Sequence, residues 1–401
     1  MTDSEQQLVR YPIPPVDAIE PPPEWERLRQ QCPVAHVQLP SGDQATLLTR
    51  YDDVRQVLSD ARFSRTAEGS ARVSAEGTGV FDRRRPGVPQ SGDGHQRWRR
   101  MITKWFTAKR MAALRPSIEA MADQLVDGMV AGGQPADLKA ALGFPLPVWV
   151  ICELLGVPAS DRERFSYWSD TFLNLSRYSA ADMEAAHAEF AAYMTGHIEA
   201  KRAEPGTDLL SDLITGTDAA GHKLTDEALV STGMGLLIAG HETTTNMIGK
   251  MMAMLLADRT RWEQLLADPA LVRTAVEEAL RYDANAGFGM IRYVTEELEL
   301  SDGVLPAGTT AVCSMASANR DERIFADAAD MDLTRSPNVH LAFGAGPHSC
   351  IGQSLARTEL QVVLEVLLRR LPTLALAVPS AELPLVEGLL VGGLREVRVI
   401  W

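Results

Sequence analysis

Apolar residues recur along most of the 401-residue chain at the three- and four-residue spacing of helices. Glycines and prolines interrupt this pattern repeatedly between residues 108 and 258, so we expect a succession of helices there. The last of them, roughly residues 225–258, would be about 50 Å long at 1.5 Å per residue. It is apolar on all sides, which predicts a buried helix that crosses the molecule.

Short alternating segments near the N-terminus predict a small β region. Residues 36–39 and 45–49 flank a Ser-Gly-Asp turn and read as a hairpin, and a helix is expected from Tyr51 to about Ser59. Residues 11–23 contain six prolines, which favours an extended arm at the surface. Residues 68–94 are rich in glycine and predict a long flexible loop. The chain therefore predicts a mainly α fold with a small β region, in one domain spanning residues 1–401 with residues 1–23 as an N-terminal arm.

Charge and composition narrow the possible partners and the cellular location. A net charge of −14 argues against nucleic acid, because phosphate binding needs a basic face. No apolar run approaches the eighteen or so residues that cross a bilayer, so no membrane association is expected. The four scattered cysteines suit a reducing compartment. We expect a cytoplasmic monomer.

The most informative stretch is residues 343–352, which read Phe-Gly-Ala-Gly-Pro-His-Ser-Cys-Ile-Gly. Gly344 and the glycine two residues later permit sharp backbone turns, and a helix predicted to begin near Gly352 directs its free amides at the sulfur of Cys350. We expect this environment to lower the pKa of the thiol and to present a thiolate suited to haem iron. Phe343 is placed to lie against the macrocycle, and His348 to donate a hydrogen bond to a propionate.

Two simpler interpretations of Cys350 are available. A lone cysteine beside glycines is more often a buried structural thiol, because free cysteine is among the most buried residue types. A zinc site would need further ligands, but the other cysteines are scattered and no Cys-x-x-Cys or His-x-x-x-His pair occurs.

The middle of the long predicted helix carries the sequence Ala-Gly-His-Glu-Thr-Thr-Thr at residues 239–245. A Thr243 hydroxyl bonded back to the carbonyl of Ala239 is expected to bulge the helix and open a groove that holds water. Thr243 would then order a proton-donating water, and Glu242 would relay protons from solvent. A helix kink without chemistry explains the same residues equally well.

Two charged motifs have ordinary interpretations when taken alone. Glu278 and Arg281 share one helix face at i,i+3 spacing, as surface ion pairs commonly do. His95 and Arg99 also share one face, and further basic residues are expected to follow on the same helix. A solvated charged face is the default explanation of such a run. These basic residues are Arg97, Arg100, Lys104, Lys109 and Arg110.

Taken together, the four motifs resemble those of the cytochrome P-450 monooxygenases, in their soluble bacterial branch. Residues 343–352 meet every fixed position of that family's haem-binding signature, and the resemblance extends over nearly the whole chain. It implies a triangular, mostly helical prism in which haem b lies between the long central helix and the helix after Cys350. It also implies that Cys350 ligates the iron and that Glu242 and Thr243 form the acid–alcohol pair.

The resemblance implies further site residues. Those expected to bind the cofactor are His95, Arg99, Arg292, Phe343, Gly344, His348 and Gly352. Glu278 and Arg281 would be buried behind the haem, where many relatives supply a third partner as an arginine before Phe-Asp. This chain reads Asp-Met-Asp at residues 330–332, so Arg335 or a backbone carbonyl is expected to substitute.

The implied activity is reductive activation of dioxygen, with electrons from NAD(P)H passing through a reductase and a ferredoxin. An acidic ferredoxin would dock on the basic face around Arg97, Arg100 and Lys104. The expected reaction is hydroxylation or epoxidation of a hydrophobic small molecule in the biosynthesis of a polyketide, macrolide or terpenoid antibiotic. Oxidative coupling, ring closure or desaturation at the same haem, a peroxide-using enzyme and a non-catalytic haem-thiolate sensor are the alternatives.

The substrate is expected to contact mostly apolar side chains. The predicted segments are residues 73–88, 168–178, 285–290 and 389–391. Within and beside them, the predicted lining residues are Met234, Leu237, Ile238, Ala239, Phe288, Met290 and Leu390.

Overall fold

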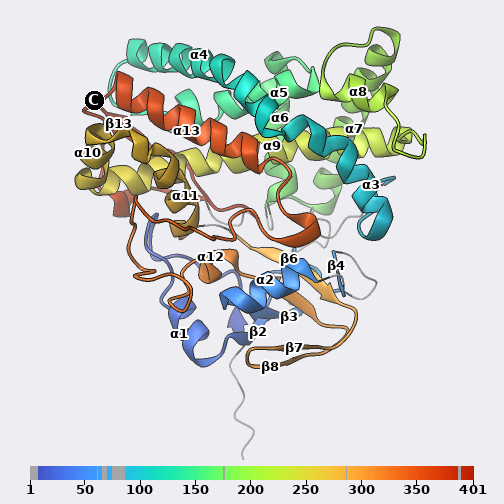
Figure 1. Ribbon diagram of the computed structural model, residues 1–401, viewed down its shortest axis with the longest axis horizontal. Coiled ribbons are helices and arrows are strands. Elements are labelled where there is room, and N and C mark those ends of the chain that lie inside the picture. The colour runs from blue at the N-terminus through green and yellow to red at the C-terminus, as the bar shows by residue number, and fades with distance from the viewer. Residues whose placement is uncertain are drawn as a thin grey trace, which may run out of the picture.

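A computed structural model describes residues 8–60, 62–65, 70–74, 86–174, 177–285, 287–386 and 390–401 of the chain. The helices are α1 (Glu24–Gln31), α2 (Tyr51–Ser59), α3 (Gly92–Thr103), α4 (Ala108–Gly132), α5 (Pro145–Leu155), α6 (Arg162–Leu173), α7 (Ala180–Ala203), α8 (Leu209–Thr215), α9 (Asp226–Ala257), α10 (Arg259–Ala267), α11 (Val272–Tyr282), α12 (Met315–Ala318) and α13 (Gln353–Arg370). Most helices gather in one part of the molecule, and the largest sheet lies in the other beside α1, α2 and α12 (Figure 1).

The largest sheet has six strands. Their order is β1 (Val9–Arg10), β2 (Val34–Gln38), β3 (Gln44–Leu48), β9 (Thr310–Cys313), β6 (Met290–Val294) and β4 (Phe63–Ser64). Strands β2 and β3 form an antiparallel hairpin in which Val34 lies opposite Leu48. The hairpin predicted from the alternating segments is therefore confirmed, with boundaries that move by one or two residues.

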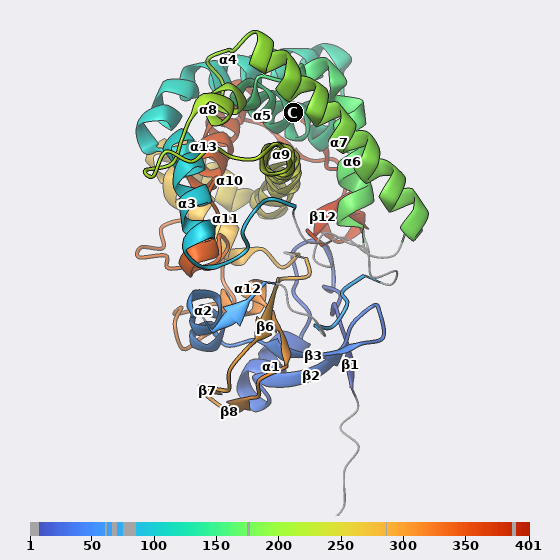
Figure 2. The ribbon, with the colours of Figure 1, turned by 90° about the vertical axis from the view of Figure 1, so that its right-hand side faces the viewer.

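Three smaller sheets complete the β structure of the described residues. One pairs β10 (Ala375–Leu376) and β5 (Ala136–Asp137) with β13 (Arg398–Ile400) between them. The others are the two-stranded pairs β7 (Leu298–Leu300) with β8 (Gly303–Leu305) and β11 (Leu385–Val386) with β12 (Gly393–Leu394). Strand β12 lies between the six-stranded sheet and the helical part (Figure 2).

Helix α9 is the long buried helix that the sequence predicts. It has 32 residues and begins after Thr225, whose hydroxyl accepts a hydrogen bond from the Ala228 amide. Figure 2 shows α9 end-on, surrounded by other helices. Gly240 lets α5 approach closely, because a Cβ at this position would lie 2.6 Å from Ile151 Cδ1. The prediction of a bulge around Thr243 was wrong, since residues 226–257 form one unbroken α-helix.

Three predictions for the first 110 residues need correction. The arm is not only a surface segment, because Val9 and Arg10 pair with β2 and Tyr11 is buried. Helix α3 begins at Gly92, inside the stretch predicted as a loop, while residues 66–69 and 75–85 of that stretch lie outside the described residues.

Arg100 shares helix α3 with Arg99, but Lys104, Lys109 and Arg110 do not. Helix α3 ends at Thr103, a 3₁₀ turn, η1, spans Lys104–Phe106, and α4 begins at Ala108. The chain turns here because Trp105 and Phe106 bury their rings in the helical core. Lys109 and Arg110 therefore belong to α4.

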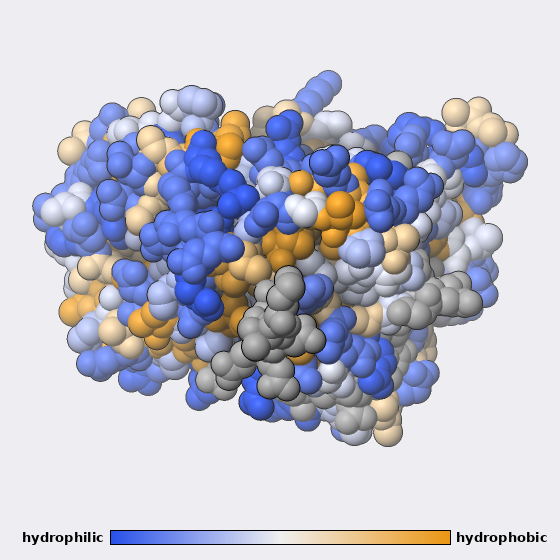
Figure 3. All heavy atoms as spheres, turned by 90° about the horizontal axis from the view of Figure 1, so that it is seen from below, coloured by the Kyte–Doolittle hydropathy of each residue, from blue (hydrophilic) through white to orange (hydrophobic). Residues whose placement is uncertain are grey.

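Polar side chains cover much of the face drawn in Figure 3, with apolar groups between them. In the part of the chain that the structure describes, no helix combines the length and the apolar character needed to cross a membrane.

The carboxyl group of Glu359 in α13 is buried without a hydrogen-bond partner. Glu359 is fully buried, and neither of its carboxyl oxygens has a hydrogen-bond partner. Burial raises the pKa of Glu359 well above its usual range, so the folded protein retains a proton that the unfolded chain releases.

We predict that Glu359→Met stabilises the protein by about 1–3 kcal/mol at pH 7, because it removes an unsatisfied buried polar group. The stability of the wild type should fall as pH rises above the ordinary carboxyl pKa, whereas the variant should not show this loss. Urea unfolding followed by circular dichroism between pH 5 and pH 8 measures both effects. A variant less stable than the wild type at pH 8 would contradict the prediction.

Candidate functional site

The cysteine loop, residues 343–352, folds back on itself before α13. The Cys350 amide donates to the Phe343 carbonyl at 2.8 Å, and the backbone at Gly344 and Gly346 has φ of +68°. A Cβ at Gly346 would lie 2.5 Å from Ser59 Cα, so the loop touches the end of α2. The sharp turns predicted from the two glycines are confirmed.

Cys350 differs from the other cysteines in its surroundings. Cys152 and Cys313 are buried, and burial raises the pKa of each thiol to about 12. Cys350 is accessible to solvent although protein atoms surround it on most sides. Among the described cysteines, Cys350 is the exposed one, whereas Cys32 is only partly exposed, so Cys350 is the thiol that a bound group reaches most readily.

The predicted lowering of the Cys350 pKa was wrong for the protein alone. Burial raises the pKa of this thiol, and the Gly352 amide, Arg99 and Arg357 only oppose that effect. The sequence motif shows the helix amide but not the desolvation, which depends on the packed neighbours. A metal ion bound to the sulfur would supply the remaining drive for deprotonation.

Cationic side chains from three segments converge beside the cysteine loop. The rings of His95 and His348 lie 4.3 Å apart, and Arg99 donates to the Ser349 carbonyl. Burial, together with the nearby positive charges of Arg65, His95, Arg292 and Arg99, lowers the pKa of His348 to about 3. Among the described residues, neither Arg99 nor Arg292 has a carboxylate partner. This cationic cluster is suited to a group that carries carboxylates.

The centre of α9 presents two accessible side chains on an otherwise mostly buried helix. Ala239 and Thr243 are exposed, whereas His241 and Thr244 are buried. Thr243 Oγ1 donates to the Ala239 carbonyl at 2.9 Å, the bond that the sequence analysis expects. Because its proton is used in this bond, the hydroxyl oxygen is available to accept a hydrogen bond from a water.

Glu242 belongs to a polar chain that was not predicted from the sequence. Its Oε1 accepts from Asn246 Nδ2 at 3.2 Å, and Asn246 Oδ1 accepts from Lys139 Nζ at 2.9 Å. Lys139 begins a π-helical turn, η2 (Lys139–Gly143), that packs against α9. The i,i+4 spacing of Glu242 and Asn246 was a readable signal, but nothing local in the sequence indicates Lys139.

Glu278 and Arg281 form a fully buried ion pair of 2.7 Å between Oε1 and a guanidinium nitrogen. Arg281 also donates to the carbonyls of Asn319, Ala328 and Asp330. Arg335 Nε lies 3.1 Å from Glu278 Oε2, so Arg335 is the third partner.

Two further donors satisfy the Glu278 carboxylate. The Asp332 amide donates to Oε1 at 2.9 Å, and Asn338 Nδ2 donates to Oε2 at 3.0 Å. This network ties α11 to the segment that leads into the cysteine loop.

A second ion-pair cluster lies next to the cysteine loop and was not predicted. Glu277 pairs with Arg357 at 2.7 Å and with His340 at 3.0 Å. The guanidinium of Arg357 lies over the Phe343 ring, 4.4 Å from its centroid. Burial alone would raise the pKa of Glu277, but the hydrogen bonds from His340 and Arg357 outweigh it and hold the pKa at about 2.

The predicted substrate-lining residues fall into two groups. Phe288 and Leu390 belong to one hydrophobic cluster, with the partly buried Ile238 against it, and Met290 lies at the edge of another. Met234 and Leu237 pack in the large helical core instead, and both Leu237 and Phe288 are fully buried. Residues 75–85, 175–176, 286 and 389 of the predicted segments lie outside the described residues.

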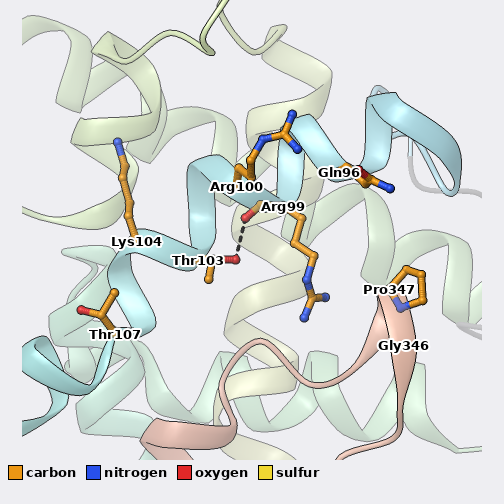
Figure 4. Close-up of a pocket in the computed structure, with 8 residues that line it drawn as sticks. All are labelled: Gln96, Arg99, Arg100, Thr103, Lys104, Thr107, Gly346 and Pro347. Carbon is orange, nitrogen blue, oxygen red and sulfur yellow. Dashed lines mark hydrogen bonds between the residues drawn. The ribbon is translucent and has the colours of Figure 1, made fainter. Parts of the chain in front are cut away.

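An open recess of about 490 Å³ lies between α3 and the cysteine loop (Figure 4). Arg99 points toward the loop, whereas Arg100 and Lys104 extend on the other side of the helix. Two of the predicted docking residues have acidic partners, since Lys104 lies 2.8 Å from Asp212 and Arg97 lies 3.8 Å from Asp218. The lining residues are Gln96, Arg99, Arg100, Thr103, Lys104, Thr107, Gly346 and Pro347.

These observations together fit haem better than a metal ion held only by protein. Within the described ranges no group of three or more His, Cys, Asp or Glu side chains is arranged to bind a metal. An accessible thiol, a cationic cluster beside it and an exposed alcohol on α9 suit a haem held by a cysteine thiolate.

Comparison with known proteins decides the family. The family model described as cytochrome P-450 matches residues 163–377. The mycinamicin IV hydroxylase/epoxidase of Micromonospora griseorubida is 40% identical over 100% of both chains. The chain belongs to the cytochrome P-450 family.

Other relatives are similar to this chain along nearly its whole length. The nocardicin C N-oxygenase of Nocardia uniformis subsp. tsuyamanensis is 40% identical, with 98% of each chain covered. The crystal structure of the thioether synthase SgvP, described as putative and involved in the tailoring step of griseoviridin, has a TM-score of 0.92 at 39% identity, covering 98% of this chain and 100% of that one. The predicted fold class and membership of a bacterial cytochrome P-450 branch are confirmed.

Membership of the cytochrome P-450 family makes this protein a monooxygenase that uses haem iron and dioxygen. The family also implies a hydrophobic substrate and a redox partner.

We predict that Arg281→Met destabilises this cytochrome P-450 by about 3–5 kcal/mol, because it leaves the buried Glu278 carboxylate undercompensated. Arg335→Met is the matched control and should cost less, since Arg281 still pairs with Glu278 and holds the surrounding carbonyls. Urea unfolding of both variants at pH 7 provides the comparison. An equal decrease in the free energy of unfolding in the two variants would show that Arg281 contributes no more to the network than Arg335.

Proposed function

We propose that this cytochrome P-450 hydroxylates or epoxidises a hydrophobic small molecule in the biosynthesis of an antibiotic-type secondary metabolite. The observation that carries the haem assignment is the accessible Cys350 thiol beside a cationic cluster. The relatives support the substrate class, because their names refer to mycinamicin, nocardicin C and pentalenic acid.

In this proposal the chain holds the haem from both sides, as one domain. The Cys350 sulfur coordinates the iron, and Phe343, Gly344 and Gly352 shape the loop around it. The propionates are bound by His95, Arg99, Arg292 and His348. Haem iron supplies the reductive activation of dioxygen and the transfer of one oxygen atom to carbon.

Thr243 and Glu242 are proposed to deliver protons. Thr243 Oγ1 is fixed by its bond to the Ala239 carbonyl and accepts a hydrogen bond from a water, which orients that water. Glu242 is partly exposed and connects through Asn246 to Lys139, so a polar path joins the centre of α9 to the half-buried Lys139. This path supports the role of Glu242 in proton supply.

Electrons are proposed to come from NAD(P)H through a reductase and a ferredoxin. The recess between α3 and the cysteine loop supports docking there, since Arg99 and Arg100 line it beside the loop that holds Cys350. Lys104 also lines the recess, and Arg97 lies on the same helix as Arg100. We propose that this basic face binds an acidic carrier, although Asp212 and Asp218 partly balance the charges of Lys104 and Arg97. We propose that the enzyme works as a cytoplasmic monomer.

A second candidate reaction has a specific observation in its favour. The SgvP structure, at 39% identity and a TM-score of 0.92, is named a thioether synthase, which joins carbon to sulfur. Oxidative coupling or ring closure at the same haem therefore remains the alternative to hydroxylation for this chain.

The haem assignment predicts a clear spectroscopic result. Cys350→Ala should abolish the strongly red-shifted Soret band of the reduced carbon monoxide complex, because that band requires a thiolate ligand. Cys152→Ala removes a buried thiol and should leave the band unchanged. An unaltered spectrum of Cys350→Ala would disprove the assignment.

The proton-delivery role predicts a change in the products of oxygen consumption. Thr243→Ala should divert electrons to hydrogen peroxide and lower product yield by about tenfold or more, because water is no longer oriented for proton transfer. Thr244→Ala is the control, since Thr244 is the buried neighbour. Peroxide released per NADPH oxidised, with ferredoxin and reductase added, is the measurement. Equal peroxide yields in wild type and Thr243→Ala would exclude the role.

A further inference from the structure

Tyr11 of the N-terminal arm is buried against the loop that carries Phe288. Its hydroxyl donates to the Phe288 carbonyl at 2.5 Å, and the two rings meet edge to face with centroids 4.9 Å apart. Strand β1 fixes this position, because Val9 pairs with Val37 and the Tyr11 amide donates to the Gln38 carbonyl at 2.9 Å. The arm is thereby tied to a residue 277 positions away in the chain.

Backbone hydrogen bonds continue from Phe288 across two further segments. The Phe288 amide donates to the Leu390 carbonyl at 2.9 Å, and the Leu390 amide donates to the Leu173 carbonyl at 2.9 Å. The side chains of Leu173, Phe288 and Leu390 lie in one hydrophobic cluster, with Ile238 of α9 packed against it. We name Leu173, Phe288 and Leu390 the apolar wall.

The loop around Phe288 has no room for side chains on either side. Gly287 and Gly289 have φ of +88° and +84°. A Cβ at Gly287 would lie 2.3 Å from the Leu390 carbonyl oxygen, and one at Gly289 would lie 2.5 Å from that of Cys313. Neighbouring backbone therefore holds the loop on two sides, and the Tyr11 hydroxyl binds the carbonyl between the two glycines.

We propose that Tyr11 is a positioning residue for substrate selection, which fixes the apolar wall by holding the Phe288 carbonyl. The inference rests on the proposed function and on the prediction from the sequence that Phe288 and Leu390 line the substrate site. Phe288 is fully buried, so it supports Leu390 and Leu173, which keep slight exposure. A ligand that reaches the wall binds more tightly when the wall is already ordered, because binding then does not pay the entropy of ordering it. A small ligand at the iron does not reach the wall, so its affinity does not depend on Tyr11.

The first test compares two nitrogen ligands of haem iron that differ in size. Tyr11→Phe should raise the Kd of the bulky azole ketoconazole by about two- to tenfold, the range expected for one net hydrogen bond. The Kd of imidazole should stay within about twofold, because removal of the hydroxyl leaves the iron site unchanged. Titration of the Soret band of the holoenzyme measures both constants.

The second test needs no haem ligand. Hydrogen exchange of the Phe288 and Leu390 amides in the holoenzyme should be about two- to tenfold faster in Tyr11→Phe, since the wall opens more easily. Mass spectrometry of the peptides that contain these residues gives the rates.

Tyr51 offers a matched control. Its hydroxyl donates to the Val339 carbonyl at 2.6 Å, and its ring meets Phe325 edge to face at 5.8 Å. Tyr51→Phe therefore makes the same chemical change in α2, in another hydrophobic cluster. It should alter neither the ratio of the two Kd values nor the exchange of the Phe288 and Leu390 amides.

The outcomes separate the inference from the function on which it rests. Unchanged exchange at Phe288 and Leu390 would overturn the positioning role. Faster exchange with an unchanged ratio of Kd values, or an equal ratio change in Tyr51→Phe, would overturn the role in substrate selection. A wild-type protein whose Soret band does not move with imidazole would contradict the haem site itself, and the substrate-selection role with it.

Discussion

The carboxylate of Glu278 is buried with no access to water, and a charge in that position must be compensated by the chain itself. The compensating groups are Arg281 on the same helix, and Arg335, Asn338 and the Asp332 amide from the segment before the cysteine loop. Because all of them must meet at one carboxylate, the path of that segment is fixed relative to α11. The position of Cys350 depends on this path.

A second cluster adds a direct link between α11 and the cysteine loop. Glu277 holds Arg357 of α13, whose guanidinium lies over Phe343, and His340 just before the loop. Adjacent residues of α11 therefore anchor the approach to the loop and the helix that leaves it. With Gly346 in contact with α2, the sulfur is held by three separate parts of the fold.

The two sides of the proposed haem site differ in their physical character. On the cysteine side, burial opposes ionisation of the thiol, while Arg99 and Arg292 supply positive charge and have no carboxylate partner among the described residues. On the other side, α9 is largely apolar and exposes Ala239 and Thr243. A planar apolar group with carboxylates at one edge matches this asymmetry. In the proposed function, the polar chain through Asn246 is the path for protons, and the apolar wall, with Ile238 of α9 packed against it, contacts the substrate.

The sequence by itself determined the features that depend on local residue order. The spacing of apolar residues placed the long helix at 225–258 against the observed Asp226–Ala257, and the glycines at 344 and 346 indicated the turns around Cys350. Only the tertiary structure decided which distant groups meet. Lys139 reaches Asn246, and Tyr11 reaches Phe288, through packing between segments more than 100 residues apart. The raised pKa of Cys350 likewise comes from desolvation, which depends on all packed neighbours and so leaves no pattern in the local sequence.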